Sequence, residues 1–120
     1  MIAALVAGAV VLGTALVLGR AGTGVAAPRF SADVQPIFER KCVACHPVAY
    51  PYLDLRRGRS YRELYRVSAA TKPAFERVVP GLPELSYLLV HPPDPSNRDL
   101  LTEEDKRVIS DWIAAGAHND

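Results

Sequence analysis

Two cysteines and a histidine lie within the short stretch CVACH, from Cys42 to His46. A disulfide between Cys42 and Cys45 would close a loop of only a few residues and would stabilise the fold little through chain entropy. Zinc prefers four ligands, and the other two histidines, His91 and His118, do not form an H-x3-5-H arrangement. A thioredoxin-like redox pair needs a βαβ pattern around its C-x-x-C, and no alternating strand pattern is evident in this chain.

C-x-x-C-H is the attachment signature of c-type haem. Two thiols at this spacing on a helical turn can form thioethers with the two vinyl groups on one edge of the porphyrin. The next residue, His46, is then carried beneath the iron as its proximal ligand. Cys42 and Cys45 are the only cysteines of the chain. The motif therefore predicts one covalently bound haem c, held by Cys42, Cys45 and His46.

The residues on either side of this motif predict an all-α domain. Val34, Ile37 and Phe38 follow one another at i, i+3 and i+4, which places them on one face of a helix that leads into the motif. Pro36 fits the first turn of such a helix. A haem would then stand in for much of the core that so small a domain cannot otherwise build.

A second strong helical pattern begins after Thr102, which has the residue type of an N-cap. Acidic residues fill the first turn at 103–105, where they complement the helix dipole. An apolar stripe follows, and Gly116 suits the stop. The stripe consists of Val108, Ile109, Trp112 and Ile113. Two shorter helices are predicted in SYRELYRVSA (60–69), with Tyr61, Leu64 and Tyr65 on one side, and in PELSYLLV (83–90), with Leu85, Leu88 and Leu89 on one side.

The chain of 120 residues has a formal net charge of +1, which does not indicate a nucleic-acid binder. Its N-terminal segment differs sharply in composition from the rest. Residues 1–19 carry no charged side chain. As a helix they would reach about 28 Å, close to the ~30 Å hydrocarbon thickness of a bilayer. We predict a transmembrane anchor at 1–20, with an uncleaved signal peptide as the alternative, a linker at 21–29 and a monohaem domain at 30–120.

Small residues recur at a four-residue spacing in this predicted anchor, which would let another transmembrane helix approach one face closely. The pairs are Ala4 with Gly8, Ala9 with Gly13, and Ala15 with Gly19. Alanine and glycine are also simply common in such segments, so a partner helix and an ordinary apolar helix both fit the pattern.

Four stretches together resemble the class I cytochrome c family, and within it the planctomycete-type cytochrome c domain. They are DVQPIFERKCVACH, LDL at 53–55, VPGLPELSYLL at 79–89 and LTEEDKRVISDWIAAGA at 101–117. The resemblance implies a fold in which the first and last helices cross, with Phe38 near Trp112. It also implies electron transfer, and a haem domain on the periplasmic side of the membrane. The anchor predicted at 1–20 would then cross the cytoplasmic membrane once.

The sixth iron ligand is where this chain departs from that family, whose members usually place a methionine in a Met-Pro-Pro run before the last helix. The only methionine here is Met1, and the corresponding run reads HPPDP, so that His91 stands at the ligand position. We predict ligation by His46 and His91, and a lower reduction potential than a His/Met site would have. As an alternative, His91 is a solvent-exposed loop residue and the iron is open. His118, Lys72 and Lys106 have no motif behind them.

Several residues after the motif are candidates for supporting roles. Leu53 and Leu55 are expected to pack against the porphyrin face. Arg56, Arg57 and Arg59 could dock an acidic partner or pair with the haem propionates, and a solvated arginine-rich surface is the alternative interpretation.

Three functions fit the sequence. The first is an electron carrier that exchanges single electrons with a membrane redox complex of a respiratory or photosynthetic chain, and it needs no catalytic residues. The second is a haem enzyme or gas sensor with an open sixth position. The third is a mainly structural cytochrome subunit of a larger membrane assembly.

Overall fold

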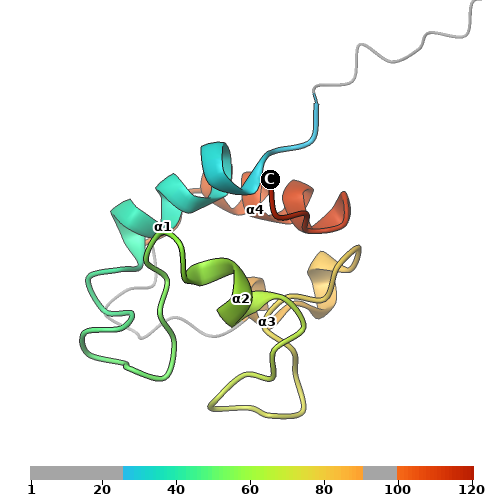
Figure 1. Cartoon of the computed structure of the whole chain (residues 1–120). Coiled ribbons are helices and arrows are strands. Elements are labelled where there is room, and N and C mark those ends of the chain that lie inside the picture. The colour runs from blue at the N-terminus through green and yellow to red at the C-terminus, as the bar shows by residue number, and fades with distance from the viewer. Residues whose placement is uncertain (1–25, 91–99) are drawn as a thin grey trace, which may run out of the picture.

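Helices are the only regular elements in the computed structural model, which describes residues 26–90 and 100–120 (Figure 1). They follow in the order η1 (Phe30–Val34), α1 (Gln35–Lys41), α2 (Ser60–Leu64), η2 (Pro83–Leu85), α3 (Tyr87–Val90) and α4 (Glu103–Ala114), where η1 is a π-helix and η2 a 3-10 helix. Within the described ranges there is no strand, only two isolated bridges, Tyr65 to Val78 and Ser68 to Glu76. The expected all-α class is confirmed at this level.

The helix that leads into the CVACH motif forms as predicted, although its first turn is wider than an α-helix. Pro36 lies in the first turn of α1, a position that proline favours. Val34, Ile37 and Phe38 are all buried. The i, i+3, i+4 face therefore points into the core, as its spacing predicted.

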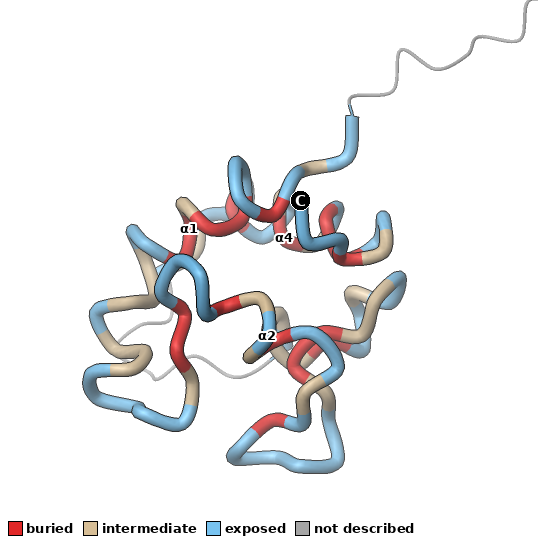
Figure 2. Tube along the Cα trace, viewed as in Figure 1, coloured by how far each residue is buried: buried red, intermediate tan, exposed pale blue. Residues whose placement is uncertain are grey.

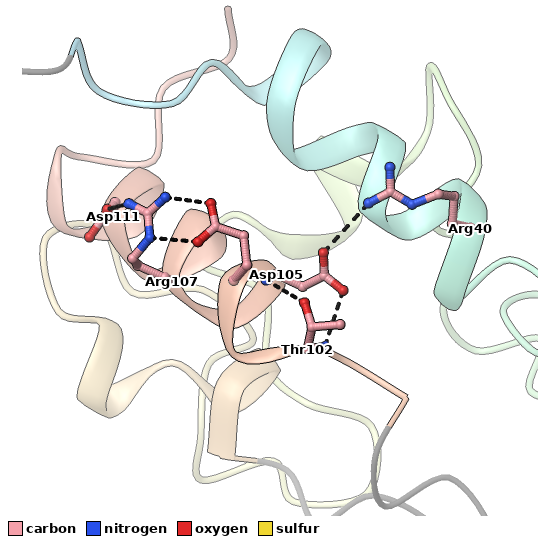
Figure 3. A network of polar contacts seen from close by, with 6 residues as sticks. Arg40, Thr102, Asp105, Arg107 and Asp111 are labelled. Carbon is pink, nitrogen blue, oxygen red and sulfur yellow. Dashed lines mark hydrogen bonds and ion pairs between the residues drawn. The ribbon is translucent and has the colours of Figure 1, made fainter.

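The last helix, α4, also begins where its sequence predicts. The Thr102 side chain accepts a hydrogen bond from the Asp105 N–H, and Oδ2 of Asp105 accepts one from the Thr102 N–H at 3.2 Å, which together form a capping box (Figure 3). Ile109, Trp112 and Ile113 are buried, whereas Val108 is only half-buried at the edge of the stripe. Gly116, with φ of +112°, adopts a conformation that suits glycine and ends the helical run.

The two shorter helices were predicted too long. The first ends at Leu64, because Arg66 takes a φ of +54° and its N–H donates to the carbonyl of Val78 at 2.9 Å. The second is interrupted at Ser86, which is extended and fully buried. The Ser86 hydroxyl accepts a hydrogen bond from the Val79 N–H at 2.9 Å, so this residue serves a turn rather than a helix.

The exposure of individual side chains on and beside these short helices also differs from expectation. Leu85, expected on the packed side of one continuous helix, is 51% exposed, and the extended conformation of Ser86 separates η2 from α3 in the chain. Leu88 and Leu89 do pack against the core. In the first short helix Leu64 is fully buried, whereas Tyr65 lies at the surface.

Phe30 is the residue that joins the first helical segment to the last helix. Its ring centroid lies 6.1 Å from that of Phe38 and 5.0 Å from that of Trp112. The three residues belong to one buried cluster. Buried segments lie on α1, α2 and α4 (Figure 2). Phe38 and Trp112 therefore share one buried cluster, in which Phe30 contacts both, and α4 packs against η1.

The predicted membrane anchor lies outside the described residues. Among residues 26–90 and 100–120, no helix has both the length and the apolar character that a membrane crossing requires.

Candidate haem-attachment site

The CVACH motif forms one helical turn at the end of α1. The Cys42 N–H still donates to the Phe38 carbonyl at 2.8 Å, which continues the hydrogen bonding of α1. The Cys42 carbonyl then accepts from the Cys45 N–H at 3.1 Å and from the His46 N–H at 2.9 Å. One turn of backbone therefore carries both thiols and the imidazole, as the motif chemistry requires.

Both cysteines are free thiols, and each is partly exposed. Cys42 packs against the hydrophobic core, and burial raises the pKa of its thiol to about 11, with smaller contributions from the charges of Asp105 and Cys45. Cys42 is therefore a protonated thiol at neutral pH. Within the described residues, no group of three or more His, Cys, Asp and Glu side chains is arranged to hold a metal ion.

His46 lies beside two tyrosines of the loop that follows it. The ring centroids of Tyr50 and Tyr52 are 5.4 Å and 5.9 Å from that of His46, and both tyrosines are partly exposed. The His46 carbonyl accepts from the Leu55 N–H at 3.4 Å, which closes this loop at its base. The loop therefore returns the chain to the core directly after the motif.

Buried Arg77 anchors the same loop, and no sequence pattern pointed to it. Its guanidinium donates to the carbonyl of Tyr52 at 3.1 Å and to the carbonyl of Glu63 at 2.8 Å. Only 8% of Arg77 is exposed. Because the buried guanidinium binds a carbonyl of this loop and a carbonyl of α2, it holds the loop that contains Tyr50 and Tyr52 against α2.

The two leucines predicted beside the porphyrin have different surroundings. Leu55 is 2% exposed and belongs to the core, and its carbonyl accepts from Nε2 of Gln35 at 3.0 Å. Leu53 is half-buried and packs against the core from outside. Of the two, Leu53 therefore has surface left for a bound group.

The side chains of the CVACH turn have the chemistry that covalent attachment of a haem requires. Two free, reachable thiols and an imidazole share a turn, and half-buried apolar side chains pack against the same core as Cys42. They include Val43, Leu53, Leu88, Leu89, Leu101 and Val108. His91 lies outside the described residues, so its role as sixth ligand stays a prediction.

Two surface hollows lie elsewhere and contain none of Cys42, Cys45 and His46. One, of about 540 Å³, is bounded by residues 26–28 and α4. The other, of about 370 Å³, is bounded by η1 and the start of α2. The candidate site therefore rests on the CVACH turn and its apolar neighbours, not on either hollow.

The arginine-rich segment after the loop is largely paired within the chain. Nε and Nη2 of Arg56 donate to the two carboxylate oxygens of Asp54 at 2.9 Å and 2.7 Å, and Nε of Arg59 lies 3.7 Å from the same carboxylate. Nε of Arg57 donates to Glu39 at 2.9 Å. Two carboxylates thus offset two of the three positive charges, although each arginine side chain keeps more than half of its surface exposed.

The Asp54 ion pair predicts a loss of stability in acid. The hydrogen bond from Arg56 lowers the pKa of Asp54 from 3.8 to about 2. Because the folded state favours the ionised carboxylate, its contribution is present above about pH 4 and is lost as the pH falls towards 2. We expect the difference in free energy of unfolding between wild type and Asp54→Asn to shrink over that interval.

Urea denaturation of both proteins at a series of pH values measures this difference. The contributions of the other carboxylates are the same in both proteins and therefore cancel. A difference that stays constant from about pH 5 to about pH 2 would contradict the assignment.

Comparisons with known proteins find no match for this chain among family models, curated proteins or solved structures. The resemblance to class I cytochromes c therefore stays a prediction from the quoted motifs.

Proposed function

We propose that this protein is a membrane-anchored c-type cytochrome of the class I type, with one haem, that passes single electrons to or from a membrane redox complex on the periplasmic side. One observation carries the proposal: Cys42, Cys45 and His46 share a single helical turn, with both thiols free and partly exposed. The all-helical domain and the half-buried apolar side chains that pack, like Cys42, against the core support it.

In this proposal each residue of the turn has one task. Cys42 and Cys45 attach the haem through thioethers, and His46 binds the iron from the proximal side. The bound haem supplies one-electron chemistry. Arg77 and the core contact of Leu55 hold the loop after His46 in place, because they fix it to α2 and to the core.

The remaining parts of the proposal concern ligation and location. His91 is the proposed sixth ligand, by its place in the HPPDP run. Residues 1–20 are the proposed single-pass anchor in the cytoplasmic membrane, and their small-residue face is the proposed contact with another transmembrane helix. Arg56, Arg57 and Arg59 are a weaker candidate surface for an acidic partner, because each is engaged by a carboxylate of this chain.

An absorption spectrum of the full chain, produced in a host that attaches haem c and solubilised in detergent, tests the proposal. After reduction with dithionite we expect sharp haem c bands that do not change when carbon monoxide is added, because both axial positions are filled. A protein without covalent haem would refute the proposed cytochrome. Bands that shift with the gas would favour a haem enzyme or sensor with an open sixth position.

The role of His91 predicts a specific change in this assay. In His91→Ala the sixth position opens, so we expect the reduced spectrum to respond fully to carbon monoxide while the haem stays attached through Cys42 and Cys45. His118→Ala, which removes the other histidine outside the motif, is the matched control and should behave like wild type. A His91→Ala protein that remains unresponsive would show that another residue is the sixth ligand.

A further inference from the structure

A buried carboxylate lies at the junction between the end of α1 and the start of α4. Asp105 is 7% exposed. Its Oδ2 accepts from the Thr102 N–H at 3.2 Å, and its Oδ1 lies 3.5 Å from Nη2 of Arg40 (Figure 3). The capping box and the ion pair therefore hold the carboxylate in one place, against the last turn of α1.

The ion pair with Arg40 places this carboxylate beside the segment that leads into the CVACH turn. Arg40 is two positions before Cys42, and the Asp105 charge is one of the causes that raise the pKa of the Cys42 thiol. The neighbouring acids of α4 differ in exposure, because the side chains of Glu103 and Glu104 are 92% and 67% exposed. Asp105 is the acid of this helical turn that is removed from water.

The partner of Asp105 compensates its charge incompletely. The Arg40 side chain is 59% exposed, whereas that of Asp105 is 10% exposed. Solvent and salt screen an exposed charge more strongly than a buried one. The positive end of the α4 dipole also offsets part of the negative charge of the carboxylate. Neutralising the carboxylate alone changes neither this dipole nor the charge of Arg40.

We propose that Asp105 lowers the reduction potential of the haem that Cys42 attaches. Reduction adds one electron and no proton, so the ferric state carries one more positive charge than the ferrous state. A buried negative charge nearby stabilises the ferric state more, since Coulomb interactions are stronger away from water. The inference rests on the proposed function and adds a residue that sets the driving force for electron transfer.

Asp105→Asn tests this role, because asparagine keeps an oxygen that can accept from the Thr102 N–H while it removes the charge. Glu103→Gln is the matched control, with the same change of net charge in the same helical turn at an exposed position. The measurement is an equilibrium redox titration of the full-length haem-bearing protein at low and at high salt. We expect Asp105→Asn to shift the midpoint potential upward by more than Glu103→Gln does, and to keep most of that shift at high salt.

Equal shifts in the two variants would overturn the role of Asp105 and leave the cytochrome proposal intact. A wild-type protein without covalent haem would instead overturn the proposed function, and this inference with it. These two failures are distinguished by the haem spectrum of the wild type alone.

A second pair of variants covers the case in which Asp105→Asn does not fold. Arg40→Gln removes the partner of Asp105, and Arg107→Gln removes an arginine of similar exposure that pairs instead with Glu104 and Asp111. We expect Arg40→Gln to lower the midpoint potential more than Arg107→Gln does. An equal or smaller lowering would overturn the inference.

Discussion

Replacing Trp112 by alanine is expected to lower the free energy of unfolding by about 3–5 kcal/mol, the range for truncating a buried aromatic residue. Trp112 is 1% exposed, and its ring centroid lies 5.0 Å from that of Phe30 and 6.3 Å from that of Tyr61. Its Nε1–H also donates to the His118 carbonyl at 2.9 Å, which fixes the chain after α4. Small domains are stable by only about 5–15 kcal/mol in total, so this loss removes much of the stability.

Urea denaturation followed by far-UV circular dichroism measures the effect, with two variants beside it. Leu85→Ala truncates an apolar residue that is 51% exposed, and we expect a change within about 0.5 kcal/mol. Trp112→Phe keeps an aromatic ring and loses the hydrogen bond to His118. Its loss in free energy of unfolding should therefore lie between those of Leu85→Ala and Trp112→Ala. A Trp112→Ala protein no less stable than Leu85→Ala would mean that α4 does not pack as described.

The parts of the fold that could be predicted from sequence are those in which local signals agree. In α4 the N-cap Thr102, the acidic first turn and the apolar stripe all indicate the same helix, and tertiary packing adds to them. In α1 the apolar spacing and Pro36 agree in the same way. Agreement of propensity, capping and periodicity is what makes a helix predictable.

The short helices were predicted too long because tertiary contacts decide where they end. Arg66 leaves α2 in a left-handed conformation that arginine does not favour, and the bond from its N–H to the Val78 carbonyl holds it there. Ser86 leaves the helical pattern to bond Val79 across a turn. Neither partner could be identified from the local sequence, because each lies several residues away along the chain.

The CVACH turn could be identified from the sequence because its five residues are consecutive, and its role in haem attachment stays a prediction. The charged residues around it could not be identified in this way. Asp105 looked like an ordinary acidic residue of a first helical turn, and only the tertiary fold brings its carboxylate to 3.5 Å from Nη2 of Arg40, two residues before Cys42. Arg77 likewise has no motif, and its burial depends on two carbonyls supplied by distant segments.

Replacing both Cys42 and Cys45 by alanine is expected to abolish covalent haem attachment completely. Intact-mass spectrometry of the denatured protein measures it, because only thioether-bound haem survives denaturation. Each single alanine variant should retain haem through one thioether, with a pyridine haemochrome spectrum between those of two thioethers and none. Ala44→Ser, at the exposed position between the two cysteines, is the control and should retain two thioethers.

The structure makes this result specific to the thiols. The hydrogen bonds that form the turn run between backbone atoms, from the Cys42 N–H to Phe38 and from the Cys45 and His46 N–H groups to the Cys42 carbonyl. Alanine keeps all of them and favours the helical conformation. Loss of covalent haem in the double variant, with the helical circular dichroism retained, would therefore result from the absent sulfur atoms. Covalent haem that persists without them would mean that another side chain attaches it, and the assignment of the CVACH turn would be wrong.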